Sequence, residues 1–153
     1  MGNRWAHLNR QQVGAYSEYF VKMELTKLGF QVYTSEVDDR GIDFVARFER
    51  GPYFSVQVKS VRGLGYVFVR KSHFYLSDDN FLALVILREE EHPDLFLIPS
   101  VAWKRETPLF RDRNYEGKKS APEWGLNVSQ KNLALLREYD FEKTATAISA
   151  INT

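Results

Sequence analysis

Three polar residues in two short segments have the chemistry to hold a metal ion and hydrolyse a phosphodiester bond. Asp43 follows a glycine and an isoleucine, and Gln57 and Lys59 flank Val58. Carboxylate and amide oxygens, with the Val58 backbone carbonyl as a further ligand, are hard donors of the kind that Mg²⁺ prefers. A bound Mg²⁺ lowers the pKa of a water molecule, and a nearby lysine stabilises charge that develops on the phosphate.

Two predicted strands must bring these residues together. Apolar residues alternate with polar ones over residues 42–48 and again over 53–60, with the turn sequence Arg50-Gly51-Pro52 between them. This pattern is typical of an antiparallel hairpin. The period of two puts Gln57 and Lys59 on one face of the second strand, and the hairpin places Asp43 beside them.

A fourth candidate lies on a predicted helix over residues 9–28. Asn9 is a suitable N-cap, and Gln12 stands at the reciprocal capping-box position. Glu18 precedes Val21 by three residues and Leu25 by seven, so it shares their side of the helix. The predicted apolar stripe consists of Val13, Tyr16, Phe20 and Met23 and is widened by Val21, Leu25 and Leu28.

The remaining segments predict an α/β domain around one sheet. Phe81–Leu87 is continuously apolar, which indicates a strand buried on both faces. Residues 31–34, 66–70 and 95–98 read as shorter extended runs, and residues 104–125 as a polar, irregular segment. A last helical pattern begins after Ser129. We therefore expect a mixed central sheet flanked by helices in a single domain over residues 1–153.

The sequence contains four short motifs in the order Gly14-Ala15-Tyr16-Ser17-Glu18, Leu28-Gly29-Phe30-Gln31-Val32, Gly41-Ile42-Asp43 and Val56-Gln57-Val58-Lys59-Ser60. Together these motifs resemble the PD-(D/E)XK nuclease superfamily. The similarity extends to Holliday-junction resolvases, Mrr-like restriction nucleases and small intron-encoded homing endonucleases of this fold. It covers about residues 10–100 and leaves residues 101–153 as an irregular basic segment followed by a C-terminal helix.

The resemblance implies a restriction-endonuclease-like fold and a role for each candidate residue. Asp43 would be the central metal ligand, Lys59 the motif lysine and Glu18 the helix glutamate of the resolvase-like branch. Gln57 stands where the motif has an acid, and Ile42 replaces its proline. The implied cofactor is Mg²⁺, with Mn²⁺ as a substitute, and the loss of one negative charge at Gln57 predicts weaker metal binding.

Charge clustering points to double-stranded DNA as the partner. The net charge is only +1, but residues 40–71 carry seven basic and two acidic residues, and residues 104–119 carry six basic and three acidic residues. Such basic segments can bind phosphates. The DNA contacts expected near the motif are Arg40, Arg62, Arg70 and Lys71. Because one active site cuts one strand, we expect a homodimer or a higher homo-oligomer.

The sequence excludes some classes of protein and leaves the role of the motif residues open. Without cysteine there are no disulfides, thiolate zinc sites or cysteine nucleophiles. No segment resembles a signal peptide or a transmembrane helix, so we expect a cytoplasmic protein with no membrane partner. Asp43 and Lys59 could instead form a cross-strand pair on a solvated face, or belong to an inactive nucleic-acid-binding module. Homing, restriction and resolvase roles are not separated.

Overall fold

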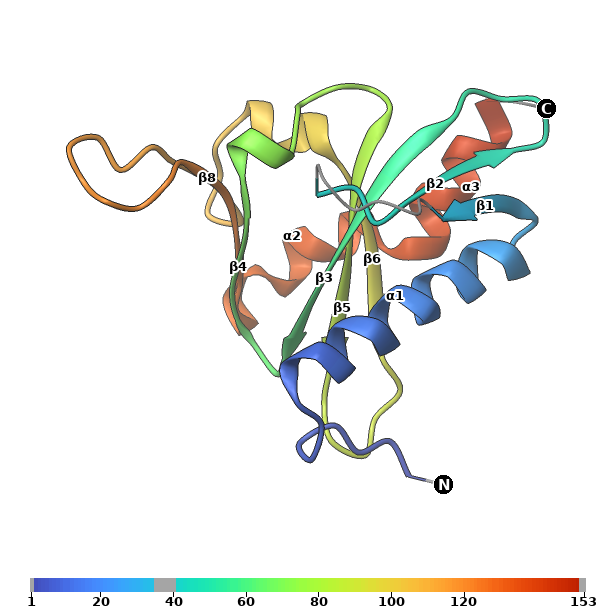
Figure 1. The fold of residues 1–153 in the computed structure, drawn as a ribbon, viewed down its shortest axis with the longest axis horizontal. Helices are drawn as coiled ribbons and strands as arrows, with labels where there is room; N and C mark the ends of the chain where they lie inside the picture. The colour runs from blue at the N-terminus through green and yellow to red at the C-terminus, as the bar shows by residue number, and fades with distance from the viewer. Residues whose placement is uncertain (1, 35–40, 152–153) are drawn as a thin grey trace.

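The computed structural model describes residues 2–34 and 41–151, which form a mixed central sheet with helices and a second, smaller sheet packed around it (Figure 1). The central sheet has five strands in the order β1-β2-β3-β5-β6. Its neighbouring strands are antiparallel, apart from the parallel pair β3 and β5. The strands are β1 (Phe30–Thr34), β2 (Phe44–Phe48), β3 (Phe54–Arg62), β5 (Asn80–Leu87) and β6 (Asp94–Pro99).

The first helix, α1 (Arg10–Lys27), has the predicted capping box at its start. Asn9 Oδ1 accepts a hydrogen bond from the Gln12 backbone N–H at 2.8 Å, and Gln12 Oε1 accepts one from the Asn9 N–H at 2.9 Å. Two backbone donors that a helix start leaves without partners are satisfied in this way. Gly29 follows the helix with a φ of 95°, a conformation that side chains disfavour, and turns the chain into β1.

The buried face of α1 differs from the predicted stripe. It consists of residues spaced by four, whereas Met23 is 60% exposed, so the prediction of a stripe through Met23 was wrong. Spacing by four keeps side chains on nearly one line of a helix, and this line packs against β1 and β3. The buried residues are Val13, Ser17, Val21 and Leu25.

The predicted hairpin is confirmed, and its register positions the site. Phe44 pairs with Val56, Val45 with Ser55 and Ala46 with Phe54. Since β2 begins at Phe44, the part of β3 beyond Val56 has no β2 partner on that edge. Its other edge stays paired with β5, whose residues 81–87 are all buried, as the continuous apolar run predicted.

Residues 104–125 are not irregular throughout, so that prediction is wrong for two stretches. β7 (Phe110–Arg113) and β8 (Glu123–Val128) are strands, and together with β4 (Gly65–Arg70) they form a three-stranded antiparallel sheet in the order β4-β8-β7. The expectation of one sheet is therefore also wrong. β7 is short and charged, so its sequence shows no clear alternation of apolar and polar residues. β8 is a strand because it pairs with β4, which lies far away in the sequence.

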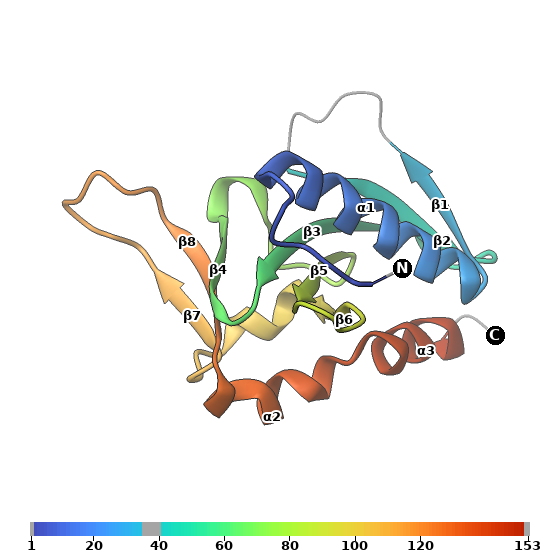
Figure 2. The same cartoon turned by 90° about the horizontal axis from the view of Figure 1, so that it is seen from below.

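Two hydrophobic clusters hold the layers together. The helices α1 and α3 (Phe141–Ile151) pack on one face of the central sheet, around residues such as Ala83, Val85 and Leu97. The small sheet packs on the other face, around Leu82, Leu84 and Ile86. Figure 2 shows the small sheet and the two helices on opposite sides of β5 and β6. Because both faces of β5 are covered, every one of its apolar residues is buried.

The predicted C-terminal helical pattern is interrupted. Ser129 caps a short 3₁₀ turn, in which the Asn132 backbone N–H donates to Ser129 Oγ at 3.3 Å. One turn of helix, α2 (Leu133–Leu136), and a second 3₁₀ turn precede α3. Within the described residues, no helix has the length and apolar character needed to cross a membrane.

Candidate active site

Asp43 is fixed at the edge of β3 that β2 leaves open. Its backbone N–H donates to the carbonyl of Val56 at 3.0 Å, and its Oδ2 accepts a hydrogen bond from the backbone N–H of Val58 at 2.6 Å. The carboxylate thus takes the position where the next β2 carbonyl would have bonded. In a strand the N–H and C=O of one residue point to the same edge, so the Val58 carbonyl also faces this side.

Glu18 lies opposite Asp43 across a small open hollow of about 300 Å³. The wall on the helix side contains two small residues, Gly14 and Ala15, and a Cβ added at Gly14 would meet no atom within 4 Å. Small residues keep this side of the hollow open. The complete lining is Gln11, Gly14, Ala15, Glu18, Asp43 and Val58.

Gln57 presents an amide oxygen that no described group satisfies. Its Oε1 is buried and accepts no hydrogen bond within the described part of the chain. Leaving a buried polar group without a hydrogen-bond partner lowers the folding stability by about 1–3 kcal/mol. An external ligand that binds this oxygen would offset that cost. The same holds for the Ser17 hydroxyl, but Ser17 faces the apolar core from α1.

Gly41 packs closely against His73 and lies beside Gln57. It has a φ of 75°, and a Cβ at this position would lie 2.9 Å from His73 Cβ and 3.5 Å from Gln57 Oε1. A side chain here would be strained by the backbone conformation and would clash with His73, whereas it would lie at an ordinary contact distance from Gln57. The Gly41-Ile42-Asp43 segment thus passes close to the glutamine and delivers the aspartate to the edge of β3.

Lys59 lies two residues beyond Gln57 and therefore on the same face of β3. It is half-buried and forms no ion pair or hydrogen bond with the described residues. The structure brings Glu18, Asp43 and Val58 to one hollow. The side chains of Gln57 and Lys59 lie on the other face of β3, because successive side chains along a strand point to opposite faces.

The oxygen donors fit a hard divalent cation. Two carboxylates, the unpartnered Gln57 amide oxygen and the Val58 carbonyl are the ligand types that Mg²⁺ and Mn²⁺ take. The described residues contain no group of three or more His, Cys, Asp or Glu side chains that could hold a metal. Asp43 and Glu18 would therefore bind the ion with neutral oxygen donors and a smaller negative charge than a three-acid site provides.

Comparison with solved structures identifies the fold. The chain is similar to Hjc, a Holliday junction resolvase from the archaeal hyperthermophile Archaeoglobus fulgidus, with a TM-score of 0.52 and 12% sequence identity. The match covers 88% of this chain and 96% of that one. The chain has a restriction-endonuclease-like fold. No protein-family profile matches the sequence, and no curated protein matches it either.

Within this fold, the four basic residues expected to bind DNA differ in their surroundings. Arg40 lies outside the described residues, and Arg70 is exposed at the end of β4. Arg62 Nη1 donates to the backbone carbonyls of Trp5 and Leu8, at 3.0 Å and 2.8 Å, and so fixes the segment before α1. DNA contacts by Arg62 and Arg70 stay predictions.

Lys71 is engaged on several sides. Its Nζ donates to Asp112 and, at 2.6 Å, to Asn114 Oδ1. It also lies 4.0 Å from the ring centre of Trp124. These contacts tie the end of β4 to the other two strands of the small sheet. A contact with DNA stays a prediction for Lys71, in competition with this structural role.

Sequence reasoning missed Lys22. Its side chain is only 16% exposed, its Nζ lies 3.6 Å from Glu18 Oε2, and it lies 5.6 Å from the ring centre of Phe44, the residue after Asp43. Lys22 therefore orients the Glu18 carboxylate from the core side. The signal was present in the sequence as the spacing of four residues from Glu18, which places two side chains together on a helix.

Proposed function

We propose that this chain is a metal-dependent endonuclease that hydrolyses phosphodiester bonds in DNA. One observation carries the proposal. The Asp43 carboxylate is fixed at the open edge of β3 and faces Glu18, while Gln57 Oε1 nearby on the same strand has no partner among the described residues. A buried amide oxygen left unsatisfied on the strand that anchors the Asp43 carboxylate supports a ligand site there.

Each residue has a role that follows from its position. Asp43, Glu18, the Gln57 amide oxygen and the Val58 carbonyl would hold Mg²⁺, or Mn²⁺ in its place. When bound, the ion lowers the pKa of a water molecule and neutralises part of the phosphate charge. Lys59, with no carboxylate partner among the described residues, donates to the phosphate oxygens as charge develops on them.

The substrate we propose is double-stranded DNA, cut in the manner of a resolvase. Hjc, which has the similar fold, is a Holliday junction resolvase, and this favours a branched substrate over a homing or restriction role. Both strands must be cut at symmetric positions, so we propose a homodimer or a higher homo-oligomer. A mass of one chain in light scattering, with and without DNA, would contradict the oligomer.

The test is cleavage of matched four-way junction, linear duplex and supercoiled plasmid substrates. Wild type, Asp43→Asn and Lys59→Met are compared with Mg²⁺, with Mn²⁺ and with a chelator. Lys131→Met, an exposed lysine far along the chain, is the matched control. Metal-dependent cutting that both site variants lose and the control keeps supports the nuclease, and a preference for the junction supports the resolvase type.

A second candidate is a DNA-binding module without catalysis. The observation that favours it is Gln57 in the position of an acid, because only two carboxylates then remain for a metal among the described residues. Its signature is salt-dependent binding to DNA that is unaffected by metal and by Asp43→Asn, with no cutting of any of the three substrates.

A further inference from the structure

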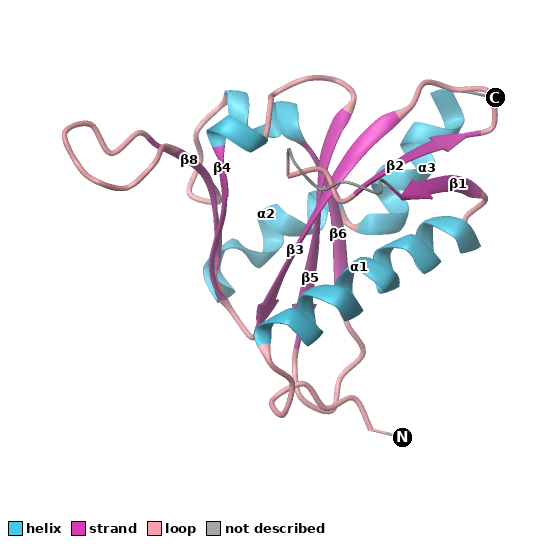
Figure 3. Ribbon diagram, in the orientation of Figure 1, coloured by secondary structure: helices cyan, strands magenta, loops and turns pink. Residues whose placement is uncertain are grey.

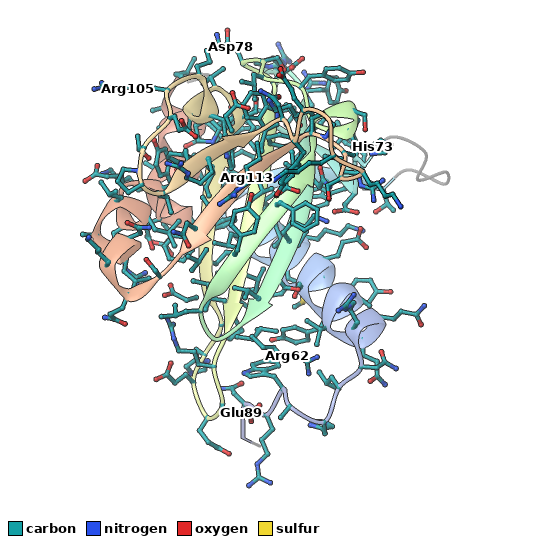
Figure 4. The ribbon with its side chains drawn as sticks, turned by 90° about the vertical axis from the view of Figure 1, so that its left-hand side faces the viewer. Arg62, His73, Asp78, Glu89, Arg105 and Arg113 are labelled. Carbon is teal, nitrogen blue, oxygen red and sulfur yellow. The ribbon has the colours of Figure 1, made fainter. Side chains whose placement is uncertain are left out.

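The outer face of the small sheet exposes large aromatic rings. Along β4, Tyr66, Phe68 and Arg70 face solvent, while Val67 and Val69 between them are buried. Tyr66 is 38% exposed and Phe68 is 46% exposed, and their rings stack with centres 6.2 Å apart and planes 22° apart. Figure 4 looks onto this sheet, and Arg113 is labelled near the middle of the view.

The Tyr66 ring is held in place by its neighbours. Its hydroxyl donates to Glu123 Oε2 at 2.5 Å, and Arg113 lies 5.0 Å from the ring centre. A Cβ on Gly125 would lie 2.0 Å from the Tyr66 hydroxyl oxygen, so only glycine lets the ring lie across β8. The ring is thus fixed flat on the sheet, a geometry suited to stacking.

A hollow of about 250 Å³ opens beside these rings, at the base of a projecting loop. The loop joins β7 to β8 and extends away from the body of the protein (Figure 1 and Figure 3). Phe68 forms an aromatic wall of the hollow, and Arg70 and Lys119 bring positive charge to it. The one acid in the lining, Glu123, is only 6% exposed and accepts the Tyr66 hydrogen bond. The hollow therefore combines an aromatic surface with cations.

We propose that this face binds an unpaired nucleotide of a DNA substrate. The base would stack on Phe68 beside Tyr66, and Arg70 and Lys119 would bind the adjoining phosphates. The inference rests on the proposed function and deepens it, since it makes DNA with unpaired bases the preferred substrate.

Two physical arguments select this ligand. Stacking of a base on an aromatic side chain tolerates any sequence and strengthens binding by about 10- to 100-fold per base. Bases inside a continuous duplex are already stacked on each other, so only a flap, a branch point or a single strand offers a free face. Arginine and lysine beside the rings match the phosphates on either side of such a base.

The experiment measures binding without cleavage, in the presence of a chelator. Fluorescence anisotropy compares a continuous duplex with the same duplex carrying a short single-stranded flap. Phe68→Ala removes the exposed ring, and Arg70→Gln removes a cation. Tyr53→Ala is the matched control, because Tyr53 is exposed to a similar extent as Phe68, at 51%, and like Tyr66 lies beneath an arginine, with Arg47 4.4 Å from its ring centre. Circular dichroism melting verifies that each variant folds.

We expect wild type to bind the flap about tenfold or more tightly than the duplex. Phe68→Ala should remove this preference, whereas Tyr53→Ala should keep it. Arg70→Gln should weaken binding to both DNAs and flatten its dependence on salt. Equal binding of flap and duplex by wild type, or equal effects of Phe68→Ala and Tyr53→Ala, would overturn the inference.

The result is separable from the proposed function. A flap preference that depends on Phe68 supports the inference even if no metal and no substrate ever give cleavage. Metal-dependent cleavage combined with a Phe68→Ala variant that binds both DNAs like wild type refutes the inference and leaves the nuclease standing.

Discussion

Two lysines, one on β3 and one just after β4, lie in opposite kinds of surroundings. Lys59 forms no ion pair or hydrogen bond with the described residues. Lys71 has Asp112, Asn114 and the Trp124 ring around its amine. The region around Lys71 satisfies its charges internally, whereas the region around Lys59 leaves an amine and the Gln57 carbonyl oxygen without partners in the described part of the chain.

Groups kept for binding and groups that stabilise the fold differ in whether the protein itself supplies their partners. Buried polar groups are nearly always paired, because an unpaired one costs folding free energy. Ser17 Oγ and Arg47 Nε are also buried without a partner in the described part of the chain, so our proposal of an external partner near Gln57 rests on the neighbouring Asp43 as well. Single substitutions on the two sides should therefore affect different observables.

The largest expected effect is that of Asp43→Asn. The asparagine Oδ1 can still accept the hydrogen bond from the Val58 N–H, so this contact should keep its contribution to the melting temperature. Loss of the charge should reduce DNA cleavage by about a hundredfold or more. Single-turnover cleavage rates and thermal melts measure the two quantities. Melting well below that of wild type would show that the charge serves the fold.

The second prediction compares substitutions of the two lysines. Lys59→Met should reduce cleavage by about a hundredfold and leave melting unchanged, because the amine has no described partner to lose. Lys71→Met should lower the melting temperature by about 2–4 °C, from the loss of roughly 1 kcal/mol of cation–π and ionic interaction. Its cleavage rate should stay within about threefold of wild type. Lower melting for Lys59→Met together with lost cleavage for Lys71→Met would instead make Lys59 the structural lysine and Lys71 the functional one.

Gln57→Glu would place a third carboxylate at the proposed metal site. With Mg²⁺ we expect half-maximal cleavage at about tenfold lower metal concentration, since a hard cation binds more tightly to an added charge. Without metal the variant should melt at a lower temperature than wild type, because a buried carboxylate replaces a neutral amide. Titration of activity and of melting temperature against Mg²⁺ tests both parts. An unchanged metal requirement would place Gln57 outside the metal site.

The smallest effect concerns Tyr66 and pH. Burial, followed by the hydrogen bond to Glu123, raises the pKa of Tyr66 well above its ordinary value of 10. Above pH 10 the unfolded chain loses this proton while the folded chain keeps it, so the stability of wild type should fall as pH rises. The Tyr66→Phe variant has no hydroxyl to titrate, so its free energy of unfolding should fall less over this pH range. Urea unfolding from about pH 9 to about pH 11 measures it, and parallel curves for the two proteins would contradict the raised pKa.

Several features of the fold and site could be predicted from the sequence because their signals are local. The capping box at Asn9 and Gln12, the β2–β3 alternation and the continuous apolar run of β5 depend on neighbours a few residues apart. Periods of about two and about 3.6 residues are fixed by backbone geometry, so they survive into the folded state. The position of Asp43 next to β3 follows from the hairpin alone.

Other features of the fold and the site depend on contacts between segments that are far apart in the sequence. The hollow between Glu18 and Asp43 depends on where β2 ends and how α1 crosses β3, and the pairing of β4 with β8 joins segments far apart in sequence. Lys71 was predicted as a DNA contact, and its three partners come from β7, β8 and the loop beyond β7. The charge of a side chain and the face of the helix or strand on which it lies can be predicted from the sequence. Whether that charge is paired depends on contacts between distant segments. Such contacts form only when the whole chain packs.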